Sequence, residues 1–290
     1  IERHQAELIR SNESDNKPSG TTGDDHANLP HQTLKNDEAR ELEILLPGVP
    51  HYQNPDRLAA AEAMIAATGC DIIIADDAMQ HRRLHRDLNI VLIDATCPFG
   101  YDHIFPRGTL REPLSGLRRA DVILLSRADR ITSGERDSIR RRALGFAPNA
   151  LWCECEHRPV ELRSAGGEVR PLESLRGERC LAFCAIGSPD GFFRSLRELG
   201  AEIVETVELP DHAPFSDAQI AQIDAAISRS GATMAVCTLK DLVKLPPGRL
   251  RLFDPLALAI EIRITEGRTP FLQKLTENTR SALDRRSISE

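Results

Sequence analysis

The sequence predicts an α/β fold with a mostly parallel sheet and a smaller second α/β lobe. Three apolar runs, CDIIIA (70–75), NIVLID (89–94) and DVILLS (121–126), are typical of strands covered on both faces. A proline-led, alanine-rich stretch at 55–67 has helical spacing. Because strands that alternate with helices form right-handed βαβ units, a parallel sheet is expected.

A second series of strands and helices follows residue 178. Its strand-like runs lie at 179–187, 201–209, 233–238 and 256–264, and its helical patterns at 191–200 and 216–229. Between the two series, apolar and polar residues alternate around Gly166-Gly167, which predicts a hairpin.

These patterns divide the chain into four parts. We expect a first lobe over residues 1–150, a hairpin-like linker over 151–178, a second lobe over 179–265 and a charged tail over 266–290. Residues 1–35 are rich in polar and chain-breaking residues, which predicts a loop or a disordered segment.

The composition excludes several classes of protein. The net charge of −7 and the aromatic content of 4% argue against a nucleic-acid-binding surface. The seven cysteines include no C-x-x-C pair, so they read as small core residues in a reducing compartment. No apolar run is long enough to span a membrane, and no signal peptide opens the chain.

Two adjacent carboxylates end the first apolar run. Asp76 and Asp77 follow CDIIIA directly, and Gln80 and His81 come soon after. Four hydrophobic residues followed by aspartate is the Walker B pattern, in which a carboxylate holds Mg²⁺ beside a nucleotide phosphate. The alternative is a strand end with two solvated acids.

The stretch GTLREPLSGLRRAD (108–121) is the second candidate site. Arg111 and Glu112 precede Pro113, which favours an extended or turn geometry before it. An arginine fixed in a loop suits phosphate recognition, although a solvated basic surface is the alternative.

PDHAPFS (210–216) is the third candidate. Asp211 and His212 follow a predicted strand, and a histidine beside an acid can act in proton transfer. Ser216 is placed to cap the next helix. A histidine that is merely structural or exposed is the alternative.

Two further stretches carry charged pairs. Asp37 and Glu38 open a helical stretch, where acids also suit the helix dipole. Lys240 and Asp241 follow a predicted strand. They lie either on a loop that faces the cleft or at the start of a helix.

Together, these motifs resemble one family, the tetraacyldisaccharide 4′-kinases of lipid A biosynthesis. The resemblance runs in order through NDEA (36–39), PDR (55–57), DDAMQHRRLHRDLNIVLID (76–94), FPRGTLREPLSGLRRAD (105–121), PDHAPFS (210–216) and TLKDLVKL (238–245). It implies a P-loop-type kinase that uses ATP and Mg²⁺ to phosphorylate the 4′-hydroxyl of a tetraacylated glucosamine disaccharide.

The resemblance also implies roles for individual residues. Asp37 would be the general base, and His212 would be its partner. Asp76 and Asp77 would hold Mg²⁺, and the loop that carries them would be supported by Gln80 and His81. Contacts with phosphate, metal or substrate would come from Arg57, Arg111 and Glu112. Asn36 stands where the family has glycine, and Met79 where it has an aromatic residue or leucine. Asp37 falls in the first lobe and His212 in the second, so we expect lobe closure to assemble the site.

One family motif is missing from the sequence. No G-x-x-x-x-G-K-[ST] loop is present, and the lysines before Asp37 are Lys17 and Lys35, neither in a glycine cradle. We expect either a truncated piece of a kinase, which the start at Ile1 favours, or a degenerate homologue. On either interpretation this polypeptide alone would be weakly active or inactive.

The resemblance implies a lipid A disaccharide precursor and ATP as partners, no nucleic acid, and a location at the cytoplasmic face of the inner membrane. Two other functions remain open from the residues. One is a non-catalytic α/β module that keeps the acceptor-sugar cleft, and the other is a Mg²⁺-dependent phosphatase-like enzyme built on Asp76 and Asp77.

Overall fold

The strands form one continuous sheet in the computed structural model, which describes residues 37–211 and 213–289. The strand order is β1-β2-β3-β8-β7-β5-β6, and β4 pairs with β3. The strands are β1 (Ile90–Asp94), β2 (Val122–Ser126), β3 (Leu151–Ser164), β4 (Val169–Arg170), β5 (Arg179–Cys184), β6 (Glu202–Glu208), β7 (Met234–Thr238) and β8 (Leu256–Glu266). Every pairing is parallel except those of β3 with β4 and with β8, which confirms the predicted fold class.

Helices cover both faces of this sheet. The α-helices are α2 (Asp37–Leu45), α3 (Arg57–Thr68), α4 (Ser133–Phe146), α5 (Pro189–Glu198), α6 (Asp217–Ser230), α7 (Leu239–Leu242) and α8 (Arg268–Ser289). Short 3₁₀ turns include η2 (Leu114–Arg119) and η3 (Ala128–Arg130). Ser216 caps α6 through a reciprocal capping box with Gln219, as the sequence predicted.

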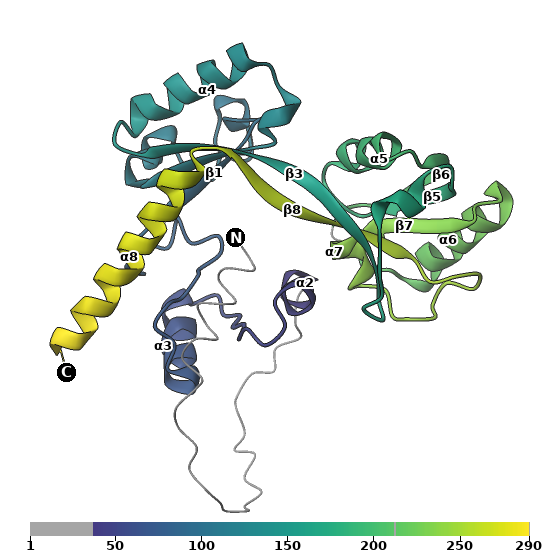
Figure 1. Ribbon diagram of the computed structural model, residues 1–290, viewed down its shortest axis with the longest axis horizontal. Helices are drawn as coiled ribbons and strands as arrows, with labels where there is room; N and C mark the ends of the chain where they lie inside the picture. Colours follow the sequence, from purple (N-terminus) through teal and green to yellow (C-terminus); the bar gives the residue numbers. More distant parts are fainter. Residues whose placement is uncertain (1–36, 212, 290) are drawn as a thin grey trace, which may run out of the picture.

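The sheet is divided into two lobes with separate hydrophobic cores (Figure 1). In the first lobe, η2 and α4 pack on one face of β1–β3, and α8 packs on the other. In the second lobe, α6 and α7 cover one face of β5–β8 and α5 covers the other. Each lobe therefore buries its own apolar layers, and neither core depends on the other.

A long two-stranded ribbon joins the lobes. β3 and β8 pair antiparallel from Glu154–Glu266 at one end to Ser164–Leu256 at the other. Near the middle, Ile260 and Ile262 are exposed, so the ribbon there is covered on neither face by a full layer (Figure 1). The predicted hairpin is present as the turn between β3 and β4.

The direction of the strands places both sets of carboxyl ends toward the centre of the molecule. β1 and β2 run parallel to β3, which leads from the first lobe into the second. β5, β6 and β7 run parallel to β8, which leads back. Ligands of parallel sheets bind beyond the carboxyl ends of the strands, so the space between the lobes is where a site is expected.

The strand predicted for CDIIIA does not form in the described residues. Residues 72–75 belong to no helix or strand, and Ile72 and Ile74 are 57% and 77% exposed. An apolar run becomes a buried strand only when a neighbouring strand and a covering layer are present. Asp76 and Asp77 therefore lie in an exposed turn, and not at the end of a buried strand as predicted.

The charged tail forms a helix whose first turns belong to the first lobe. Phe271 is 4% exposed and packs with Leu272 and Leu275 against β2 and β3. Gly267 makes the turn from β8 into α8, with φ of +76°. A Cβ at this position would lie 2.6 Å from the carbonyl oxygen of Trp152, so only glycine allows this close approach.

Candidate active site

The first cluster of functional residues is built on the second lobe, at the carboxyl ends of β5, β6 and β7. Asp211 follows β6, and Lys240 and Asp241 follow β7 on α7. Lys240 Nζ lies 3.8 Å from Asp211 Oδ1. Asp211 also lies against Gly187, because a Cβ there would be 3.2 Å from its Oδ2. These sequence-predicted residues therefore meet at one edge of the sheet.

Asp241 is the most deeply buried residue of this cluster, and hydrogen bonds hold its carboxylate in place. It is fully buried, and its Oδ2 accepts hydrogen bonds from the backbone N–H of Ala185 at 3.1 Å and from the Thr238 hydroxyl at 2.6 Å. Its Oδ1 pairs with Lys244 Nζ at 3.2 Å. A buried carboxylate with these partners is satisfied, so it holds α7 against β5 and β7.

Asp37 joins this cluster from the N-terminal part of the chain. α2 packs against α7, and Asp37 Oδ2 lies 3.7 Å from Lys244 Nζ. The sequence assigned Asp37 to the first lobe, but the structure places its helix on the second (Figure 1). The assignment of Asp37 to the first lobe is therefore wrong, and its expected meeting with His212 falls on a residue outside the described ones. We call Asp37, Asp211, Lys240, Asp241 and Lys244 the second-lobe cluster.

Glu41, one helical turn after Asp37, shows the electrostatic character of this region. Burial raises the pKa of its carboxyl above the ordinary value. Lys240 opposes the shift, whereas Glu38 and other nearby acids add to it. Acidic groups are thus crowded where α2 meets α7, and Lys240 on α7 partly compensates them.

The second cluster lies on the first lobe and joins the two other predicted motifs. Arg111 forms an ion pair with Asp77, and Gln80 Nε2 donates to Glu112 Oε1 at 3.3 Å. Asp77 has a positive φ of 50°, which is uncommon for a residue other than glycine. The turn at 76–81 and the loop at 111–112, more than 30 residues apart, therefore form one unit.

Arg119 holds this unit together, and the sequence reasoning did not single it out. Its Nη2 lies 2.6 and 2.7 Å from the two carboxylate oxygens of Glu112, and 3.4 Å from the carbonyl oxygen of Met79. The Glu112 side chain folds over Gly116, where a Cβ would lie 2.7 Å from its carboxyl carbon. The spacing E-x-x-x-G-x-x-R was the available signal. We call Asp77, Gln80, Arg111, Glu112 and Arg119 the first-lobe cluster.

The other predicted residues take different positions. Arg57 opens α3 and donates to the carbonyl oxygen of Asn54 at 2.6 Å. His81 stabilises the turn through its backbone, since its carbonyl oxygen accepts from Arg86 Nη1 at 2.7 Å. Asp76 is exposed beside Asp77. His212 lies outside the described residues.

A further charged pair stands at the carboxyl ends of β1 and β2. Asp94 ends β1 and pairs with Arg127, which follows β2 with a left-handed φ of 55°. His157 on β3 is close enough to feel both charges, and burial first and Arg127 second lower its pKa. No sequence motif marked this pair, which stands at the carboxyl ends of two first-lobe strands.

The residues present fit a magnesium ion of the kind that kinases use. Within residues 37–211 and 213–289, no group of three or more His, Cys, Asp or Glu side chains converges as a protein-only metal cage. Mg²⁺ in such enzymes is held by one or two carboxylates, with water and substrate phosphates completing the shell. Asp76 and Asp77, adjacent and exposed, supply that number of ligands.

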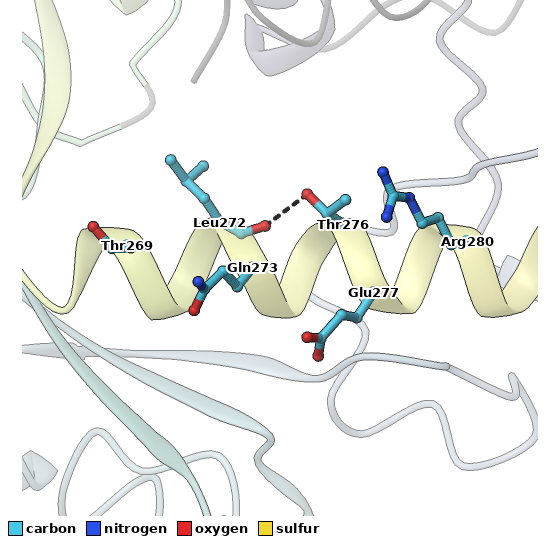
Figure 2. A pocket seen from close by; sticks show the side chains of 6 residues that line it. All are labelled: Thr269, Leu272, Gln273, Thr276, Glu277 and Arg280. Atoms are coloured by element: carbon cyan, nitrogen blue, oxygen red, sulfur yellow. Dashed lines mark hydrogen bonds between the residues drawn. The ribbon is translucent and has the colours of Figure 1, made fainter.

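A hollow on α8 does not belong to either cluster. Figure 2 shows that all of its lining side chains come from one helix face, namely Thr269, Leu272, Gln273, Thr276, Glu277 and Arg280. It contains no convergent titratable groups from a second element. It is therefore the surface of a projecting helix and not a substrate site.

An α/β protein with a carboxylate–arginine cluster on one lobe and a carboxylate–lysine cluster on the other has the parts of a phosphoryl-transfer enzyme. The family model described as tetraacyldisaccharide-1-P 4′-kinase matches residues 25–279. The chain belongs to this family, as the sequence motifs predicted.

Curated relatives support the same membership. A tetraacyldisaccharide 4′-kinase of Anaeromyxobacter sp. (strain Fw109-5) is 40% identical over 231 residues, which are 78% of this chain and 60% of the relative. The corresponding protein of Geobacter metallireducens is 38% identical over 232 residues, 79% of this chain and 65% of the relative. The chain thus spans roughly three fifths of these relatives.

A solved structure shares the fold. The crystal structure of the "apo" form of LpxK from Aquifex aeolicus in complex with ATP matches with a TM-score of 0.62 and 27% identity. The match covers 84% of this chain and 68% of that one. Within the described part of our chain, no helix is both long and apolar enough to cross a lipid bilayer.

Proposed function

We propose that the protein transfers the γ-phosphate of ATP to the 4′-hydroxyl of a tetraacylated glucosamine disaccharide 1-phosphate. The observation that carries this proposal is the presence of two charged clusters, one on each lobe, that contain the family's motifs. Phosphoryl transfer needs charge neutralisation on the phosphate and alignment of the acceptor hydroxyl. The two clusters are suited to these separate tasks.

In this proposal the first-lobe cluster acts on the phosphates. Asp76 and Asp77 would hold Mg²⁺, which when bound neutralises charge on the phosphate oxygens. Arg111 is 66% exposed, so its guanidinium can leave Asp77 for a phosphate oxygen without a large desolvation cost. Glu112, fixed by Arg119, keeps Gln80 and the aspartate turn in place.

The second-lobe cluster acts on the acceptor. Asp37 would accept the proton of the 4′-hydroxyl as this oxygen attacks the γ-phosphorus and the bond to ADP breaks. A carboxylate serves this role only when it is ionised, and Lys244 provides a positive charge 3.7 Å away. We propose His212 as a partner of Asp37 on the grounds of the family motif alone.

The acceptor also suggests where the enzyme works. A tetraacylated disaccharide is a membrane lipid, so we propose that the protein acts at the cytoplasmic face of the inner membrane.

The test measures transfer of ³²P from [γ-³²P]ATP to the disaccharide 1-phosphate by the full-length protein, because this chain spans only part of its relatives. We expect turnover that depends on Mg²⁺, and a loss of about 10²- to 10⁴-fold on Asp37→Ala. Asp137→Ala, which removes an exposed carboxylate on α4, is the control and should leave turnover unchanged.

Two results would contradict the proposal. Binding of the acceptor without phosphate transfer would indicate a non-catalytic module. Release of phosphate from phosphomonoesters without nucleotide would indicate a phosphatase.

A further inference from the structure

A lysine outside the catalytic assignments stands between two carboxylates in the second-lobe cluster. Lys244 follows α7, and its side chain is only 8% exposed. Its Nζ lies 3.2 Å from Asp241 Oδ1, 3.7 Å from Asp37 Oδ2 and 5.9 Å from the centre of the Phe215 ring. The cation is therefore largely removed from water and is compensated by acids from two different elements.

The frame of the second lobe fixes the position of this lysine. Both hydrogen bonds from Ala185 and Thr238 go to Oδ2 of Asp241, which leaves Oδ1 for Lys244. Because Asp241 is fully buried, it cannot reorient without losing these bonds. Asp241 therefore holds the Lys244 ammonium group in a fixed position beside α2.

We propose that Lys244 is a positioning residue for phosphoryl transfer, which holds the carboxylate of Asp37 ionised and oriented. This inference rests on the proposed function, in which Asp37 receives the hydroxyl proton. Lys244 itself need not touch the substrate. Its effect comes from a positive charge that favours the ionised carboxylate and from the ion pair that ties α2 to α7.

The surrounding charges explain why such a residue is needed. Asp37 and Glu41 of α2 share their surroundings with Glu38 on the same helix and with Lys240 and Asp241 of α7, and Asp211 from the loop after β6 pairs with Lys240. His212 of that loop lies outside the described residues. The acids outnumber the lysines, and like charges disfavour ionisation of a carboxyl. Lys244 opposes this effect directly at Asp37, and Lys240 pairs with Asp211.

The experiment compares Lys244→Met, Lys244→Gln and Lys244→Arg in the full-length protein. Steady-state transfer from ATP to the disaccharide 1-phosphate is measured from pH 5 to 9, with thermal melting of each variant. Lys274→Met on α8 makes the same chemical change away from α7 and is the matched control.

We expect Lys244→Met and Lys244→Gln to lower kcat about tenfold or more while KM for the acceptor changes less than about twofold. The acid limb of the pH profile should move to higher pH, because the carboxylate without its cation takes up a proton more readily. Lys244→Arg should restore most of kcat and the original acid limb, and Lys274→Met should match the parent.

Each other outcome contradicts a stated part of the inference. A kcat within about twofold of the parent and an unmoved acid limb in Lys244→Met would remove the positioning role while Asp37→Ala still tests the proposed function. Loss of the melting transition in both uncharged variants would show that Lys244 serves folding instead. A parent protein without transfer activity would contradict the proposed function and this inference together.

Discussion

The first-lobe and second-lobe clusters contain similar charged residues in very different surroundings. Arg111 and Asp77 on the first lobe are 66% and 50% exposed, whereas Lys244 and Asp241 on the second are 8% and 0% exposed. An exposed ion pair contributes little to stability and can exchange partners, but a buried one is strongly destabilised when one member is removed. The first cluster is therefore suited to a ligand that arrives and leaves, and the second to a base that must not move.

Removal of the buried acid should have the largest effect on stability. Asp241→Asn removes the nearer, fully buried carboxylate of Lys244 and leaves the more distant Asp37 to compensate it, so we expect the free energy of unfolding to fall by about 3–5 kcal/mol. Urea denaturation of this chain measures the loss. Asp217→Asn is the matched control, because Asp217 is 92% exposed and its pair with Arg249 should contribute only about 0–1 kcal/mol. Equal losses of unfolding free energy in the two variants would contradict the claim that the buried ion pair contributes more to stability than an exposed one.

The arginine that anchors the first-lobe cluster should have an intermediate effect. Arg119→Met removes both contacts to Glu112 and leaves that carboxylate half-buried, which should cost about 1–3 kcal/mol in urea denaturation. Arg118→Met, at the exposed neighbouring position, is the control. A larger loss than that of Asp241→Asn would show that the first-lobe cluster is the more rigid one.

Adding a single methyl group at Gly116 is a smaller perturbation of the same contact between Arg119 and Glu112. Gly116→Ala places a Cβ against the Glu112 carboxylate, which must shift away from Arg119. We expect a loss of about 1 kcal/mol in unfolding free energy and a clear decrease in phosphate transfer by the full-length protein. Gly145→Ala is the control, because a Cβ there meets no atom within 4 Å. Unchanged transfer in Gly116→Ala would mean that Glu112 does not position the first-lobe cluster.

The smallest expected effect concerns His157 on the ribbon between the lobes. Burial and Arg127 lower its pKa in the folded protein, so below the unfolded pKa of about 6.5 the unfolded chain binds more protons than the folded one. Its contribution therefore makes stability fall as the pH drops below that value. In His157→Gln, urea denaturation between pH 7 and 5 should show a shallower decline. A steeper decline would contradict a lowered pKa of the partly buried imidazole.

The sequence predicted most strands and helices, because periodicity and caps are local signals. It failed at CDIIIA, since a run of isoleucines does not reveal whether a neighbouring strand is present to pair with it. It also placed Asp37 on the wrong lobe. Chain order assigned α2 to the first lobe, whereas the ion pair between Asp37 and Lys244 joins residues about 200 positions apart.

Within the sites, the residues of the motifs could be predicted from the sequence, but the residues that hold them in place could not. Asp77, Gln80, Arg111 and Glu112 stand in recognisable stretches, and the structure brings them together. Arg119 and Lys244 act through contacts that only the folded chain defines. The spacing of Arg119 from Glu112 and Gly116 was a local signal, but no local pattern distinguished Lys244 from other lysines.

The central claim is that the two clusters serve one reaction, with phosphates on the first lobe and the acceptor hydroxyl on the second. A crystal structure of the full-length protein with a non-hydrolysable ATP analogue, Mg²⁺ and the disaccharide 1-phosphate tests it most directly. We predict the metal at Asp76 or Asp77 and the 4′-hydroxyl oxygen within about 2.6–3.2 Å of a carboxylate oxygen of Asp37, with Lys244 still paired to Asp37. An acceptor bound with its 4′-hydroxyl away from Asp37, or a metal held by other residues, would contradict it.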